Sequence, residues 1–240
     1  MPRFFLESIE ESNIQITGED AHHIGYALRM RPGDALTVCA NGRDYHCRIR
    51  KLTADTVYLD AESSVLCAAE PSVAITLYQA VPKSDKLAQI IQKSVELGVV
   101  RIVPVLTRRC VARPSTADFQ KKLPRLQKIA QAAAKQAGRG CIPEVAPLYS
   151  FSQAIAEMQQ AEQSLLFYEG GGVHLQELQL TGCRDLAIFV GSEGGLDPEE
   201  AEAAKQAGLQ PVWLGPRILR CETAPLCALS AVLFAAGALD

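Results

Sequence analysis

Apolar and polar positions follow two different patterns along the chain, and the change comes near residue 70. Before that point, short runs with alternating apolar residues predict strands, and one run with helical spacing predicts a helix. The strands are expected at 13–17, 35–40, 45–50 and 56–61, and the helix at 19–29. Asn41-Gly42 separates two of the strands and is a strong hairpin signal. We therefore expect a small barrel-like β domain over residues 1–70, with residues 61–71 as the linker.

From residue 72 onward, predicted strands and helices alternate. Strands are expected at 73–81, 101–106, 164–168 and 186–190, and helices at 84–97, 124–137, 151–160 and from Pro198. The helix at 124–137 is expected to begin at Pro124, because proline is tolerated best in a first turn. Two of the strands are apolar without alternation, which is typical of parallel strands buried on both faces. The second region therefore reads as an α/β domain with a mainly parallel sheet.

Two glycine-bearing turns follow strands in this second region. Gly191-Ser-Glu-Gly-Gly195 comes after the strand at 186–190, and a helix start with Asp197 as its N-cap comes next. Leu214-Gly-Pro-Arg-Ile-Leu-Arg-Cys-Glu-Thr-Ala224 follows the apolar run 212–214 and leads into an apolar helix near Pro225. Ligands bind at the carboxyl ends of parallel strands. We expect the two loops to build one pocket.

The first loop lacks the signatures of the common nucleotide sites. It is neither a G-x-G-x-x-G fingerprint nor a phosphate loop with its lysine, which weakens the NAD and ATP interpretations. Glycines allow the backbone to approach a ligand closely. Glu193 would repel phosphates and better suits a ligand that carries positive charge, such as a sulfonium or an amino group. An ordinary turn is the alternative interpretation.

Charge is distributed unevenly along the chain. The formal net charge is −3, but between residues 101 and 139 ten basic residues face a single acid, Asp118. The basic residues are Arg101, Arg108, Arg109, Arg113, Lys121, Lys122, Arg125, Lys128, Lys135 and Arg139. Such asymmetry indicates a face that binds a polyanion, although a solvated helix surface would give part of the same pattern.

The cysteines and the apolar runs argue against a disulfide-bonded, metal-binding, membrane-spanning or secreted protein. None of the eight cysteines forms a Cys-x-x-Cys pair, so we expect reduced thiols and no metal site. Cys221 lies in the second loop and is either functional or a small pocket-lining residue. No apolar run reaches the ~18 residues of a membrane span. Glu7 and Glu10 interrupt the start of the chain, so a cytoplasmic protein without a signal peptide is expected.

Taken together, the two loop sequences resemble the RsmE family. Further matches are Gln92-Lys-Ser-Val-Glu-Leu-Gly98, Arg108-Arg109-Cys110, Gln136-Ala-Gly-Arg139 and His22-His23-Ile24 with Leu28-Arg29 after it. Members are SPOUT-type methyltransferases that methylate N3 of a uridine in 16S rRNA of the small ribosomal subunit. The resemblance implies a PUA-like RNA-binding β-barrel over 1–70, a trefoil-knot domain over 72–240, a homodimer, and S-adenosyl-L-methionine as methyl donor.

The resemblance also implies which residues bind the donor. They lie in three loops, and they are Leu166, Phe167, Gly191, Glu193, Gly194, Gly195, Leu214, Gly215, Ile218, Leu219, Arg220 and Thr223. Two positions depart from the family pattern. Ser192 stands where proline is usual, which would loosen the loop, and Cys221 stands where threonine is common.

Methylation at N3 needs the loss of a proton from a neutral imide. Arg220 is expected to stabilise the resulting uracil anion, and Glu193 or Glu222 is expected to accept the proton. Alternatively, Glu222 pairs with an arginine and holds the loop. Arg29, Arg109 and Arg139 are expected to contact RNA, with salt bridges as the alternative for the last two.

Two rival functions stay open at this level. A non-catalytic RNA-binding or ribosome-assembly protein would use the β domain and the basic segment without binding the methyl donor. A nucleotide-using α/β enzyme would bind ATP or NAD, and the missing fingerprints disfavour it. Binding of S-adenosylmethionine would distinguish the methyltransferase from both rival functions.

Overall fold

The computed structural model describes residues 1–10 and 12–239, and these form two compact units. The first unit comprises Met1–Glu70 and Ala134–Ile142, and the second comprises Pro71–Ala133 and Pro143–Asp240. The change of pattern near residue 70 therefore coincides with a division between the units. The sequence-based boundaries had given residues 134–142 to the second domain, whereas their contacts lie with the first.

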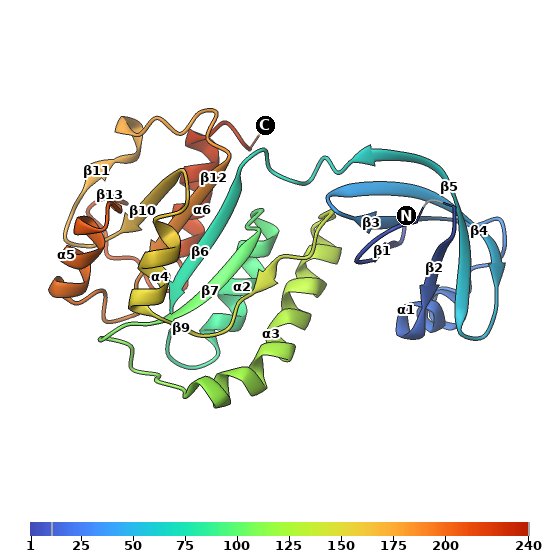
Figure 1. Ribbon diagram of the computed structural model, residues 1–240, viewed down its shortest axis with the longest axis horizontal. Helices are drawn as coiled ribbons and strands as arrows, with labels where there is room; N and C mark the ends of the chain where they lie inside the picture. The colour runs from blue at the N-terminus through green and yellow to red at the C-terminus, as the bar shows by residue number, and fades with distance from the viewer. Residues whose placement is uncertain (11, 240) are drawn as a thin grey trace. The chain divides into compact units, whose positions relative to one another are not determined.

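A five-stranded sheet forms the first unit, with the order β1-β3-β4-β5-β2 (Figure 1). The strands are β1 (Arg3–Phe5), β2 (Ile14–Thr17), β3 (Ala35–Ala40), β4 (Arg43–Leu52) and β5 (Thr56–Leu66). The hairpin between β3 and β4 turns at Asn41 and Gly42, whose φ angles are 50° and 71°. Positive φ at both central residues is what a tight hairpin needs, so the predicted turn is confirmed.

The helical run between β2 and β3 has two parts. An α-helix, α1 (Gly18–His22), continues into a π-helical turn, η1 (His23–Ala27). Ala21 and Ile24 of these turns are buried in a core that the β-strands complete with alternate residues such as Ile14 and Ile16. The predicted helix over 19–29 is thus confirmed as a short, mixed helix.

The predicted linker begins inside a strand. β5 extends to Leu66, and its second half pairs with β4, with Ser63 opposite His46 and Ser64 opposite Tyr45. The side chains at 60–63 are exposed, so this part of the strand carries polar residues that resemble a linker in the sequence. Backbone pairing rather than burial stabilises it as a strand.

The second unit is built on a parallel sheet with the order β11-β13-β10-β12-β6-β7-β8, and β9 also pairs with β7. Its strands are β6 (Ala74–Ala80), β7 (Arg101–Leu106), β8 (Glu144–Val145), β9 (Tyr149–Ser150), β10 (Gln163–Phe167), β11 (Val173–His174), β12 (Asp185–Val190) and β13 (Gln210–Trp213). Every pairing in this sheet is parallel. The α/β class and the parallel sheet are confirmed.

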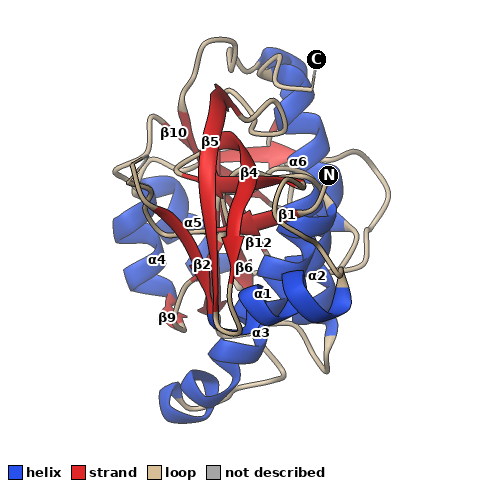
Figure 2. Cartoon of the chain, turned by 90° about the vertical axis from the view of Figure 1, so that its right-hand side faces the viewer, coloured by secondary structure: helices blue, strands red, loops and turns tan. Residues whose placement is uncertain are grey.

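Helices cover both faces of this sheet. Side chains of α4 (Phe151–Met158) and α5 (Pro198–Gln206) share one core cluster with the central strands. α2 (Lys86–Glu96) packs beside α6 (Ala224–Ala235), which contacts β12. In Figure 2, β6 and β12 lie between these two pairs of helices. The buried central strands can therefore be apolar without alternation, as their sequences predicted.

Helix α3 (Thr116–Gln136) corrects one prediction, because Pro124 lies inside it and not at its start. The helix begins earlier, where Ser115 Oγ accepts the Asp118 amide at 3.1 Å and Phe119 is buried. Pro124 is exposed, so water can bond the backbone carbonyl that it leaves without an amide partner. The apolar anchor and the cap make the first two turns stable despite the proline.

None of the helices in the described residues is long and apolar enough to cross a membrane.

Candidate active site

A pocket of about 780 Å³ lies at the carboxyl ends of β10, β12 and β13. Three loops line it, and this volume is within the range of small-molecule sites. It brings together most of the predicted donor-binding residues, namely Phe167, Gly191, Glu193, Gly194, Gly195, Leu214, Gly215, Ile218, Leu219 and Arg220. The expectation that the two glycine-bearing loops meet in one pocket is therefore confirmed.

Three predicted residues lie outside this lining. Leu166 is fully buried in the core cluster that includes α4 and α5, because successive strand residues point to opposite faces. Thr223 is exposed at the N-cap position of α6, without a side-chain capping bond. Glu222 lies beside the pocket residue Cys221, whose thiol donates to its Oε2 at 3.2 Å.

The loop at 191–195 closes tightly on itself and on its neighbours. The amide of Gly195 donates to the Ser192 carbonyl at 3.0 Å, and the Gln79 side-chain amide donates to the Gly191 carbonyl at 3.2 Å. A Cβ atom on Gly194 would come within 3.0 Å of the Arg109 carbonyl oxygen. Glycine at this position therefore permits a close approach of two backbones.

The loop at 214–223 is more open. Gly215 begins it with a φ of 98°, and the Arg220 carbonyl accepts the amides of Thr223 and Ala224, which starts α6. Between these points the side chains project from the fold, and Ile218 is 85% exposed. The loop therefore offers apolar and cationic groups to a ligand rather than to the protein core.

A single lysine joins the two loops. Lys86, in the first turn of α2, lies 3.2 Å from Oε1 of Glu193 and 2.9 Å from Oε2 of Glu222. Both oxygens of Glu193 also accept the backbone amide of Lys83 at 3.1 Å. Since Glu193 belongs to one loop and Glu222 to the other, Lys86 connects both pocket walls to α2.

These contacts determine the protonation of both carboxyl groups. The hydrogen bonds from Lys86 and Cys221 lower the pKa of Glu222 to about 2. Burial acts to raise the pKa of Glu193, but hydrogen bonds from backbone amides, the Cys221 thiol and Lys86 lower it overall. The same hydrogen bond to Glu222 raises the pKa of Lys86. All three groups are charged at neutral pH, and neither carboxylate is a strong base.

Cys221 is a neutral thiol in this setting. Burial, followed by hydrogen bonds to the two glutamates, raises its pKa to about 12. A thiol needs to ionise before it can act as a nucleophile. Of the two interpretations of Cys221, the structure favours the small pocket-lining residue.

Arg220 differs from the buried Cys221 in its exposure to solvent. Its side chain is exposed, it lines the pocket, and it forms no hydrogen bond or ion pair with residues 1–10 or 12–239. Its neighbour Arg217 is also an exposed lining residue. The pocket therefore has cationic groups that are not used within the described part of the chain.

The three arginines predicted to contact RNA differ in their availability. Arg29 is exposed in the first unit, where its φ is 53°. Arg109 is partly exposed, donates to the Gly194 carbonyl at 3.3 Å, and lies 3.8 Å from Asp197. Arg109 thus supports the loop at 191–195 and keeps part of its guanidinium open to solvent.

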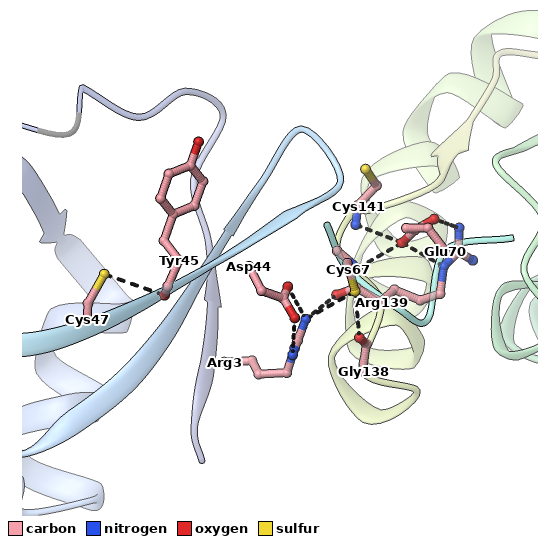
Figure 3. Close-up of polar contacts among 10 residues, drawn as sticks. Arg3, Asp44, Tyr45, Cys47, Cys67, Glu70, Gly138, Arg139 and Cys141 are labelled. Carbon is pink, nitrogen blue, oxygen red and sulfur yellow. Dashed lines mark hydrogen bonds and ion pairs between the residues drawn. The ribbon is translucent and has the colours of Figure 1, made fainter. Parts of the chain in front are cut away.

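Arg139 corrects the prediction of an RNA contact, because only 1% of the residue is exposed. Its guanidinium donates to Glu70 at 2.9 and 2.7 Å, and the same carboxylate accepts the amides of Gly140 and Cys141 (Figure 3). Arg3 also donates to the Arg139 carbonyl at 3.3 Å. A buried guanidinium with a carboxylate partner is not accessible to a phosphate, so Arg139 is a structural residue of the first unit.

The basic segment as a whole is more neutral than its sequence suggests. Most of its members form ion pairs, which are Arg101–Glu144, Arg101–Glu157, Arg108–Asp197, Arg108–Glu199, Arg109–Asp197, Lys121–Asp118, Arg125–Asp85, Lys135–Asp20 and Arg139–Glu70. Their partners lie far away in sequence in most cases. A count along the chain therefore overestimates the positive charge that is available to a polyanion.

The sequence analysis missed Glu169, which lines the pocket, and three residues that contact its lining, namely Gln79, Lys83 and Lys86. These three follow or end β6, which pairs with β12 in parallel, so they reach the edge where the loop at 191–195 begins. Knowledge of the strand order could have identified them, because neighbouring parallel strands end together. Glu169 directly follows the strand run that was predicted at 164–168.

Comparison with known proteins agrees with the geometry of both units. The family described as RNA methyltransferase domain matches residues 69–233, and the RNA methyltransferase PUA domain matches residues 16–62. The ribosomal RNA small subunit methyltransferase E of Bacillus subtilis is 34% identical, over 98% of this chain and 96% of its own. The protein of that name from Synechocystis is 31% identical, over 94% and 74%.

A solved structure shows the same fold. The ribosomal RNA small subunit methyltransferase E of Neisseria gonorrhoeae, bound to S-adenosyl methionine, superposes with a TM-score of 0.86 at 31% identity. The match covers 98% of each chain. With a family match over most of the chain and relatives of this identity along nearly its full length, this protein belongs to the RsmE family of RNA methyltransferases.

Proposed function

We propose that this protein transfers a methyl group from S-adenosyl-L-methionine to N3 of a uridine in 16S rRNA of the small ribosomal subunit. The pocket at the ends of β10, β12 and β13 carries this proposal. It lies in a fold that matches, along the whole chain, a relative whose structure contains S-adenosyl methionine.

The pocket residues fit such a donor. Gly191, Gly194 and Gly215 expose backbone groups that can bond an adenine edge, and Leu214 and Leu219 supply apolar walls. A side chain on Gly194 would instead press on the Arg109 backbone and displace this loop. The donor, when bound, supplies an electrophilic methyl group on a positively charged sulfur.

Arg220 is assigned the stabilisation of the uracil anion. Its guanidinium is exposed at the pocket and is not engaged by other groups of the described residues. A fixed positive charge near the uracil carbonyls lowers the cost of removing the N3 proton. The arginine can therefore promote the reaction without accepting the proton itself.

Glu193 and Glu222 are assigned to loop positioning rather than to proton transfer. Both share Lys86, and their lowered pKa values make them weak bases. The alternative role considered for Glu222, an ion pair that holds its loop, fits these contacts, with a lysine in place of the expected arginine. We leave the proton acceptor to solvent or to the RNA.

The remaining assignments concern partners. Residues 1–70 are proposed to bind RNA as a PUA-like domain, and residues 72–240 to bind the donor and catalyse the transfer. A homodimer is proposed to form through α6, where Phe234 is 78% exposed. The substrate places the reaction in the cytoplasm.

Methyl transfer from labelled S-adenosylmethionine tests the function. The substrate is small ribosomal subunits from cells that lack this protein, and the product is identified by mass as N3-methyluridine. Donor binding without transfer to any such subunit would contradict the assigned substrate. Failure to bind the donor would favour a non-catalytic RNA-binding or assembly role instead.

Substitution of Arg220 tests the mechanism. Arg220→Ala is expected to reduce kcat by about 10²–10³-fold, because it removes one preorganised charge from the transition state. Arg217→Ala is the matched control, since it removes an exposed arginine from the same loop. It is expected to reduce kcat much less than Arg220→Ala does. Wild-type turnover in Arg220→Ala would exclude the role proposed for this residue.

A further inference from the structure

The pocket contains two acidic side chains, and only one of them is paired. Glu193 is held by Lys83 and Lys86, as described above. Glu169, which follows β10, lines the pocket and forms no hydrogen bond or ion pair with any other residue in the described ranges 1–10 and 12–239. The pocket arginines are not within ion-pair distance of it. One negative charge at this pocket therefore has no counterpart among the residues that the structure describes.

The carboxylate of Glu169 lies against the backbone of the loop at 191–195. A Cβ atom on Gly195 would stand 1.8 Å from Oε1 of Glu169, so the carboxylate occupies the space that a side chain would take. Gly195 also has a φ of 66°, which favours glycine. The loop therefore leaves room for Glu169 on the surface that is assigned to the donor.

We propose that Glu169 selects the positively charged methyl donor over its uncharged-sulfur product. This inference rests on the proposed function. Glu169 is an exposed residue of the pocket, and an unpaired carboxylate near a protein surface still attracts a cation more strongly than it does in bulk water. The sulfur of S-adenosylmethionine carries a positive charge, and the sulfur of S-adenosylhomocysteine does not.

The donor and its product differ in charge only at the sulfur, because methyl transfer converts a sulfonium into a neutral thioether. In the transfer, the N3 lone pair forms the new bond to carbon, and both electrons of the broken S–C bond stay on sulfur. The two ligands share the adenosine, the amino group and the carboxylate of the amino acid. A carboxylate that senses the sulfur therefore favours the donor, whereas a contact with the shared parts would favour both equally. Glu169 would thus help product to leave after each turnover.

Titration calorimetry of the full-length protein with each ligand separates these cases. For Glu169→Gln, we expect S-adenosylmethionine to bind about tenfold more weakly and S-adenosylhomocysteine to change by less than about twofold. The loss should shrink as salt is raised, because part of the site is open to solvent. Glu177→Gln, an exposed glutamate outside the pocket lining, is the control and should change neither affinity.

The outcomes distinguish this inference from the proposed function. If wild-type protein binds both ligands and methylates RNA, but Glu169→Gln weakens both ligands equally or neither, the selection by Glu169 is wrong and the function stands. If wild-type protein binds neither ligand, the proposed function fails and this inference fails with it. A selective loss for the charged ligand supports the inference, and it does so without any measurement of methyl transfer.

Discussion

Each unit contains a network that joins a carboxylate to a cation, and the two networks differ in burial. In the first unit, Glu70 accepts two bonds from the buried Arg139 and two more from backbone amides (Figure 3). In the second, Lys86 is shared by Glu193 and Glu222, and all three side chains are about a quarter to a third exposed. In the first network Arg139 is enclosed by protein and the Glu70 side chain is 18% exposed, whereas the second network lies beside a pocket.

Burial determines what each network contributes. Removing one partner from a buried ion pair leaves a charge without solvation, which destabilises the fold strongly. An exposed pair is screened by water and contributes little to stability. The Glu70 network is therefore expected to maintain the first unit, and the Lys86 network to position two loops for the donor.

The largest effect is expected from Arg139→Met. It leaves the mostly buried Glu70 carboxylate without its cation, so the first unit should lose about 3 kcal/mol of unfolding free energy. Hydrogen exchange in β1, β3 and β4 measures this loss. Fluorescence of Trp213, the single tryptophan, reports on the second unit separately.

Arg48→Met provides the matched control for this prediction. Arg48 also pairs with a carboxylate through two nitrogens, but about half of each side chain is exposed. Its loss should cost less than about 1 kcal/mol. Equal losses in Arg139→Met and Arg48→Met would contradict the importance of burial.

A more moderate effect is expected from Lys86→Met. Without the lysine the two loops lose their common cation, so the KM for S-adenosylmethionine should rise about three- to tenfold with little change in kcat. Lys86→Arg should restore much of the affinity. Lys93→Met removes the same charge from the same helix, at a site whose one ion pair within residues 1–10 and 12–239 is with Glu96, and it should leave KM unchanged. A fall in kcat alone would indicate a direct chemical role for Lys86.

The same variant should reveal a dependence on pH. Since the folded pKa of Glu222, about 2, lies below its ordinary value of 4.5, the attraction to Lys86 is present above about pH 4.5 and is lost as pH falls toward 2. The difference between wild type and Lys86→Met in urea midpoints, followed by Trp213 fluorescence, should therefore narrow between pH 7 and pH 3. A constant difference would argue against the ion pairs as its cause.

The smallest effect is expected at Ser192, whose buried hydroxyl has no hydrogen-bond partner among the described residues. Ser192→Ala removes an unsatisfied polar group, so unfolding free energy should stay unchanged or rise by up to about 1 kcal/mol. Ser150→Ala should instead lose about 1 kcal/mol, because Ser150 caps α4 in a capping box. A clear loss in Ser192→Ala would mean that the hydroxyl is bonded in solution.

Local sequence patterns predicted most helices, strands and turns, because these elements depend mainly on residues that are neighbours in the sequence. The hairpin at Asn41-Gly42, the parallel strands β10 and β12, and the Asp197 cap of α5 all follow from periodicity or turn chemistry. The start of α3 was not predicted from the sequence. The burial of Phe119 stabilises the first turns of this helix, although Pro124 lies in its interior. No local pattern indicates a knotted path, which was expected only from the family resemblance.

The site was predictable where it lies within a loop and less so where it depends on contacts between distant segments. The two glycine-bearing loops were found from their sequences. Lys86 joins them from a helix more than a hundred residues earlier, and Arg139 meets Glu70 across 69 residues of sequence. Charge counts cannot show such partners, so Arg139 was expected at a surface, and Glu193 or Glu222 was expected to accept the proton.

The first unit is discontinuous in sequence, because Ala134–Ile142 belongs to it. A gene fragment that ends at Glu70 would encode a carboxylate without the guanidinium and the two amides that it binds. Such a fragment should be poorly soluble, and exchanging residues 1–70 between relatives should succeed only when residues 134–142 are exchanged with them. We therefore expect productive recombination of this gene to move its two separated pieces together.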